Sequence, residues 1–148
     1  MNISDHIEII KNLIEALPSH PTVKLFSGTL KPEDLKSLKL DGKRPYVLLS
    51  HIGGPVPDRN SRVRLELDAV FGAWVVGKVD PTTIGMSLVA IDTAFEIAKI
   101  IDSYRGDPKT NTKLPVLQFI EESFNGVTDG KSGYSSWSVT WSQRIVLF

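Results

Sequence analysis

The sequence contains no cysteine, and this absence excludes disulfide bonds and thiolate metal ligands. Histidine is scarce too, because only His6, His20 and His51 occur, and their positions share no short, regular spacing. A zinc site would need such spacing together with acidic partners on the same face. We therefore expect neither a metal nor a cofactor. No apolar run approaches the roughly 20 residues that span a bilayer, so we also expect no membrane contact.

The chain also lacks net charge, since 17 Lys and Arg residues balance 17 Asp and Glu residues. General nucleic-acid binding requires a basic domain, so we expect at most weak and transient contact with DNA. A neutral surface has little self-repulsion and therefore permits self-association. The first residues carry Asp5 and Glu8 and lack the basic start of a signal peptide, which favours the cytoplasm. A length of 148 residues predicts a single domain, residues 1–148.

No group of side chains in the sequence is arranged for catalysis. Ser50 and His51 resemble a nucleophile beside its base, but adjacent residues of a strand point to opposite faces. The same argument counts against Glu121 and Glu122 as an acid/base pair, because they are neighbours on a predicted strand. The glycine pair that begins the segment 53–55 is not followed by Gly-Lys-Ser/Thr, and it leads into a strand instead of a helix. We therefore predict no catalytic residue and no enzymatic activity.

What the sequence does contain is an alternating apolar pattern of unusual length, at residues 62–79. This is the pattern of a strand with one buried face, and it continues for about three times the usual strand length. Residues 134–148 repeat the pattern with Trp137 and Trp141. A small domain with two such strands forms a ribbon or an extended surface, and nothing in this pattern indicates a catalytic cleft. The apolar positions of the first stretch are Val63, Leu65, Leu67, Ala69, Phe71, Ala73, Val75 and Val79, with Gly77 as the only gap.

The remaining segments predict two helices and three shorter strands. Apolar residues at three- and four-residue steps predict a first helix at 5–17, which Pro18 ends. Asp80 and Pro81 are a favourable N-cap and first residue for a second helix at 81–101. Its expected buried stripe is Ile84, Leu88, Ile91, Phe95 and Ala98. Ile97, Ile100 and Ile101 widen this stripe, so the helix is expected to be covered on much of its girth. The three strands are expected at residues 22–26, 45–52 and 114–124, with turns at Asn125-Gly126 and Asp129-Gly130.

This order predicts an α+β fold: one domain with a largely antiparallel twisted sheet, one very long strand and two helices packed against it. We assign no role to the segment 28–43.

Candidate interface residues lie along the long strand and the loop before it. Glu66 and Asp68 share a face with Arg62 and Arg64, and cross-strand ion pairing on a solvated face is the first explanation. The alternative is an interface stripe, positive at one end and negative at the other, that pairs head-to-tail with a second copy. The loop 53–61, which carries the further candidates Asp58 and Arg59, would project from the sheet.

The three tryptophans receive two different predictions. Trp137 and Trp141 fall on one face of the last strand and are expected in the core. Trp74 lies on the polar face of its strand. An exposed Trp74 would suit a protein interface, and a covered one is an equal alternative.

The layout resembles the tail-terminator proteins of long-tailed phages. It is most similar to the phage Mu-type terminator, which is also found in prophages, and more distantly to the lambda-type terminator. The resemblance covers most of the chain and depends on the order of elements. These elements are the helix 5–17, the strand Pro45-Tyr46-Val47-Leu48-Leu49, the long strand from Arg62 to Phe71, the helix 81–101 and the aromatic hairpin 117–124 and 136–148.

The resemblance implies a structural protein of the virion. Tail terminators form a ring, typically a hexamer, that caps the tail tube at its head-proximal end, fixes tail length and offers a docking surface to the head connector. The implied partners are therefore other copies of the chain, the tail tube protein, the head–tail connector and, in contractile tails, the sheath. DNA passes through the ring transiently. The implied location is the virion tail, with the host cytoplasm during assembly, and the family has no catalytic residues.

Two alternatives remain open at this stage. The first is another head–tail connector or tail-completion protein, which shares the small α+β architecture. The second is a small-molecule-binding or enzymatic α+β domain, in which Tyr134, Trp137 and Trp141 would line a pocket between sheet and helices. The lack of a convergent set of polar residues counts against this second alternative.

Overall fold

The computed structural model describes residues 3–27, 44–56, 65–83, 85–105, 114–128 and 132–147. These residues form two helices and a five-stranded sheet, as the α+β prediction required. The elements in chain order are α1 (Ile3–Glu15), β1 (Thr22–Leu25), β2 (Tyr46–Gly53), β3 (Leu65–Lys78), α2 (Leu88–Ser103), β4 (Val116–Thr128) and β5 (Ser132–Leu147).

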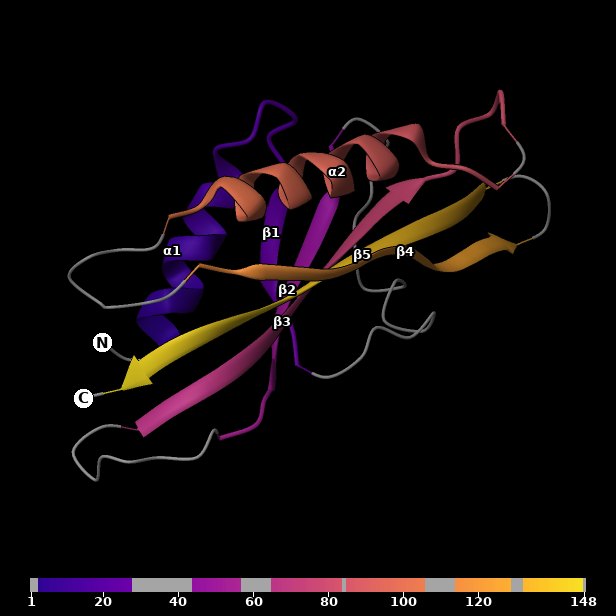
Figure 1. The fold of residues 1–148 in the computed structure, drawn as a ribbon. Helices are drawn as coiled ribbons and strands as arrows, with labels where there is room; N and C mark the ends of the chain where they lie inside the picture. Colours follow the sequence, from indigo (N-terminus) through magenta and orange to yellow (C-terminus); the bar gives the residue numbers. More distant parts are fainter. Residues whose placement is uncertain are drawn as a thin grey trace.

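The strands lie in the order β1-β2-β3-β5-β4, and only the β1–β2 pair is parallel (Figure 1). β3 pairs with β5 along its whole length, from Leu65 opposite Leu147 to Lys78 opposite Tyr134. The predicted long ribbon is therefore confirmed for the described residues. β5 comes last in chain order, yet it lies between β3 and β4, so β1 and β4 are left as the two edges of the sheet.

Both helices pack on the same face of the sheet and share one apolar core with it. Phe71 on β3 and Trp141 on β5 are fully buried at its centre, with ring centroids 5.6 Å apart and an interplanar angle of 19°. Trp137 is partly buried and packs against this core, so the core prediction is confirmed in full for Trp141 and in part for Trp137. α1 contributes Ile10 and Ile14 to the core. Its observed bounds lie two residues before the predicted 5–17.

α2 begins later than the sequence predicted. Its N-cap is Ser87, whose hydroxyl accepts a hydrogen bond from the Ala90 amide, and the helix starts at Leu88 instead of Pro81. The Asp80 carboxylate instead accepts hydrogen bonds from the Thr82 amide (3.0 Å) and hydroxyl (2.7 Å), which closes a local turn. These bonds stabilise the charged carboxylate and lower the pKa of Asp80.

The buried face of α2 matches the predicted stripe in part, because Ala98, Ile97 and Ile101 are buried as expected. Leu88 and Phe95 were expected in the core, but they are 45% and 48% exposed, and Ile84 lies outside the described residues. The buried face of the helix combines small side chains with two isoleucines, and its first turn lies against Gly77, where a Cβ would lie 3.3 Å from the Ala90 methyl. The gap at Gly77 in the alternating pattern thus makes room for the helix. The buried residues of α2 are Ala90, Thr93, Ala94, Ile97, Ala98 and Ile101.

The β4–β5 hairpin is longer than predicted. Asn125 and Gly126 were expected to form a turn, but their backbones lie within β4 and pair with Ser135 and Tyr134. Pairing continues to Thr128 opposite Ser132, and the second predicted turn, at residues 129–130, lies outside the described residues. The local turn signal at Asn125 is overridden because the long strand β5 supplies backbone hydrogen-bond partners there.

Candidate interaction surfaces

The predicted interface stripe is only partly within the described residues. Asp58, Arg59, Arg62 and Arg64 lie outside them, as does the segment 28–43. Glu66 and Asp68 lie on β3 and are half-buried. By strand alternation they share the sheet face that carries Trp74, which is the face opposite the helices.

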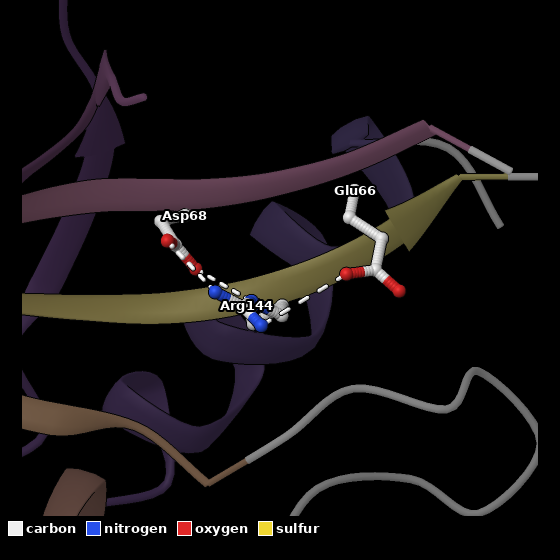
Figure 2. Close-up of polar contacts among 3 residues, drawn as sticks. All are labelled: Glu66, Asp68 and Arg144. Atoms are coloured by element: carbon white, nitrogen blue, oxygen red, sulfur yellow. Dashed lines mark hydrogen bonds and ion pairs between the residues drawn. The ribbon is translucent and has the colours of Figure 1, made fainter. Parts of the chain in front are cut away.

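Arg144 on β5 binds both acidic residues of this stripe (Figure 2). Its Nε lies 2.8 Å from Asp68 Oδ1 and its Nη2 lies 3.1 Å from Asp68 Oδ2, which is a bidentate pair. Glu66 Oε2 lies 3.9 Å from Nη1. The hydrogen bonds and negative charge of Asp68, with a smaller contribution from Glu66, raise the pKa of Arg144. Cross-strand ion pairing, the first explanation given for Glu66 and Asp68, is therefore what the structure shows.

Sequence reasoning missed Arg144 because the pair depends on register. Asp68 lies directly opposite Arg144 only when Leu65 pairs with Leu147, and no local pattern fixes that register. With Arg144 in place, the acidic part of the stripe carries one formal positive charge beside its two negative charges. The strength of a head-to-tail contact at this stripe is reduced accordingly.

Trp74 is buried, with only 7% of its surface exposed. The Trp74 ring lies over Gly72, where a Cβ would come within 2.9 Å of the ring. The Phe26 ring contacts the Trp74 ring edge-on, with ring centroids 6.4 Å apart. Leu48 and Val76 complete this second, smaller apolar cluster. Of the two alternatives for Trp74, the covered one matches the structure, so an exposed aromatic anchor at this position is excluded.

The middle of the same sheet face carries exposed apolar side chains. Ile52 on β2 is 57% exposed, and its Cδ1 lies 3.5 Å from the position a Cβ would take at Gly72. Gly72 is opposite Thr140, and Thr140 is opposite Phe119 on β4, which is 61% exposed. Two exposed apolar side chains thus lie on this face, Ile52 on β2 and Phe119 at the β4 edge, with Gly72 and Thr140 between them. Large exposed apolar side chains at an unpaired edge are typical of a protein contact surface.

A buried polar cluster lies under the start of α1. The rings of His6 and His51 contact Phe71, with centroid distances of 5.2 Å and 5.0 Å. His6 is fully buried, and among the described residues neither of its ring nitrogens has a hydrogen bond of good geometry. Burial lowers the pKa of His6, the Gln143 side chain opposes this shift, and the charge of His51 adds to it. This arrangement favours a neutral imidazole in the folded protein.

The structure separates the side chains that were considered for a ligand pocket and for a nucleophile–base pair. Tyr134 packs with the Trp74 cluster, whereas Trp137 and Trp141 pack in the helix-covered core, so the three do not line one pocket. Ser50 is opposite Gly72 and His51 is opposite Phe71, which places them on opposite faces, as predicted.

Metal binding and membrane spanning each require a particular arrangement of residues. Within the described residues, no group of three or more His, Asp or Glu side chains is placed to hold a metal ion. Neither described helix is long and apolar enough to cross a membrane.

Comparison with known proteins gives no relative: no protein-family model matches the sequence, and no curated protein matches it.

Proposed function

We propose that this protein is a tail terminator of a long-tailed phage or prophage. In this role it forms a ring of identical subunits, hexameric by the resemblance, that caps the tail tube, fixes its length and offers a docking surface to the head connector. Its other contacts would be with the tail tube protein, with the sheath in contractile tails and with DNA in passage. Its place is the virion tail, after assembly in the host cytoplasm.

The observation that carries the proposal is the paired layout of β3 and β5. The resemblance depended on a long alternating strand, a following helix and an aromatic hairpin. In the described residues the strand and the hairpin share one sheet, and the helix packs against it. The exposed residues Ile52, Val116 and Phe119 support a protein that works through contact surfaces. A ring also needs two different faces on each subunit, and this sheet has two different edges.

The first test is native mass spectrometry of the purified protein over a concentration series, with and without magnesium. We expect a discrete ring-sized species, with a hexamer as the specific expectation. The second test adds the protein to tubes assembled from the tail tube protein encoded nearby. Electron microscopy should then show a density at one tube end, and further growth of the tubes should stop.

The two tests separate the terminator from its alternatives. A protein that neither forms a ring nor binds tube ends would contradict the proposal. Binding to the isolated head connector without any effect on tube growth would favour a connector or tail-completion protein. Tubes incubated with heat-unfolded protein are the control for nonspecific adsorption.

A further inference from the structure

The β4 edge of the sheet has the features of a binding site for another strand. Among the described residues β4 pairs only with β5, so about half of its backbone N–H and C=O groups point away from this sheet. Its side chains Val116 and Phe119 are both 61% exposed on the face opposite the helices. β4 is 13 residues long, so it is not protected by being short, although two register irregularities, between Leu117 and Phe119 and between Glu122 and Phe124, interrupt its pairing with β5.

Apolar surface flanks this edge on the helix side as well. The Ser19 hydroxyl binds Glu96 at 3.0 Å, so Glu96 points from α2 toward α1. Phe95 leaves the helix on the other side and contacts Trp137, with ring centroids 6.2 Å apart. Trp137 is opposite Glu122 of β4 in the sheet. A strand added to β4 would therefore meet Phe119 on one face and Phe95 with Trp137 on the other.

The β4 edge is acidic. Glu121 and Glu122 are exposed, and by register they lie on opposite faces, since Glu121 is opposite Ser138 and Glu122 is opposite Trp137. Among the described residues, neither glutamate takes part in an ion pair. Two copies that joined through β4 alone would bring these like charges together, which disfavours a symmetric β4–β4 contact.

The opposite edge strand, β1, is four residues long and carries one basic side chain, Lys24, beside the apolar Leu25. The Thr22 amide donates to Pro45 O and the Phe26 amide donates to Leu49 O, so the backbone groups of Val23 and Leu25 point away from β2. Leu25 is 55% exposed. Lys24 is exposed and, because it is opposite Leu48, it lies on the same sheet face as Glu121 and Phe119.

We propose that the β4 edge of one copy pairs with the β1 edge of a second copy. In a sheet that continues from copy to copy with the same face outward, β4 and the incoming β1 run antiparallel, because β4 is parallel to β3 and β1 is antiparallel to it. Glu121 and Lys24 then share a face. The contact joins two different edges, so it is head-to-tail and closes into a ring if the rotation between copies permits.

This inference rests on the proposed function only for ring closure, because edge pairing itself is a property of the sheet. It also replaces the stripe of Glu66 and Asp68 as the head-to-tail contact, since Arg144 already binds that stripe within the chain.

The test uses two charge reversals on the full chain, Glu121→Lys and Lys24→Glu. Both residues are exposed, and circular dichroism and thermal unfolding verify that each variant is folded. Sedimentation velocity over a concentration series should show that each variant associates about tenfold or more weakly than the wild type, because like charges then face each other. The matched control is Glu8→Lys, an exposed reversal on α1, which should leave association unchanged.

An equal mixture of the two variants provides the decisive result. Position 121 of the Glu121→Lys variant is then basic and faces position 24 of the Lys24→Glu variant, which is acidic. The remaining pair of edges regains the wild-type charges, so the mixture should recover wild-type association. Unchanged association of either single variant, a mixture as weak as its components, or a wild-type protein that stays monomeric throughout would each overturn the edge pairing.

The same variants keep this inference separable from the terminator function. Tube capping that is insensitive to both variants would overturn the edge pairing and leave the terminator function standing. Association that depends on both edges, in a protein that does not bind tube ends, would support the edge pairing and contradict the terminator function.

Discussion

Replacing Gly77 with alanine would place a methyl group where the start of α2 meets β3. The added Cβ would collide with the Ser87 hydroxyl and would lie 3.3 Å from the Ala90 methyl. Overpacking at such a site costs about 1–3 kcal/mol. Displacement of Ser87 also weakens the N-cap bond to the Ala90 amide, and loss of an N-cap costs about 1 kcal/mol.

An opposing term reduces this cost, because replacing glycine by alanine lowers the entropy of the unfolded chain and stabilises by about 0.4–1 kcal/mol. We therefore expect Gly77→Ala to lower the free energy of unfolding by about 2 kcal/mol. At this chain length the midpoint of thermal unfolding should fall by roughly 4–8 °C. Urea unfolding followed by tryptophan fluorescence measures the change directly.

A double-mutant cycle tests the physical reason. Ser87→Ala alone should cost about 1 kcal/mol through the lost cap. In that variant the hydroxyl in the path of the new methyl is gone, so Gly77→Ala should cost about 1 kcal/mol less than it does in the wild type. Strictly additive costs, or a stabilising Gly77→Ala, would refute the close approach of α2 to β3.

Two further predictions concern charged and titrating groups. Arg144→Gln should lower the unfolding temperature at low salt and have little effect at high salt, because the Arg144–Asp68 pair is a third exposed and is therefore screened by salt. Equal losses at both salt concentrations would contradict this reasoning. The control is Lys11→Gln, which breaks the surface pair with Glu15. Burial lowers the pKa of His6 below its ordinary value of 6.5 in the folded protein, so between these two pKa values the unfolded chain binds more protons than the folded one. The free energy of unfolding should therefore fall as the pH drops from about 6.5 to the folded pKa. Urea unfolding across this pH range should show that the free energy of unfolding of His6→Gln depends less steeply on pH than that of the wild type. An equally steep dependence in His6→Gln would assign the effect to other groups.

The sequence predicted the long strands because their signal is repeated many times. The alternation in β3 includes Leu65, Phe71 and Val75, and each position independently favours the same face. The two tryptophans of β5 form an equally consistent pattern. From these strands and the first helix, the fold class followed without knowledge of the strand order.

The start of α2 was mispredicted because two caps compete within a few residues. Asp80 and Ser87 are both favourable N-caps, and local preference does not rank them. In the structure, packing accompanies the later start, because the helix that begins at Leu88 places Ser87 and Ala90 over Gly77. The apolar residues around much of α2 also permitted two buried stripes, and the small side chains allowed the closer approach to the sheet.

The candidate surfaces depend on information that no local pattern contains. Arg144 is recognised as the partner of Asp68 only through the β3–β5 register. Phe119 and Lys24 are recognised as edge residues only when β4 and β1 are known to be the outer strands. The sequence therefore predicted which residue types are available for contacts but could not predict where the sheet ends.

The position of β5 has a consequence for synthesis on the ribosome. β3 and β4 have no shared neighbour until β5 has left the exit tunnel, because β5 lies between them and follows both in the chain. Until then, the side chains of Phe71 and Val75 on β3 lack the cover that β5 and its tryptophans provide, and a nascent chain with such exposed apolar surface is prone to aggregate. The last strand to be synthesised therefore completes the middle of the sheet, and a β4 edge with the geometry that a second copy could recognise exists only after that step.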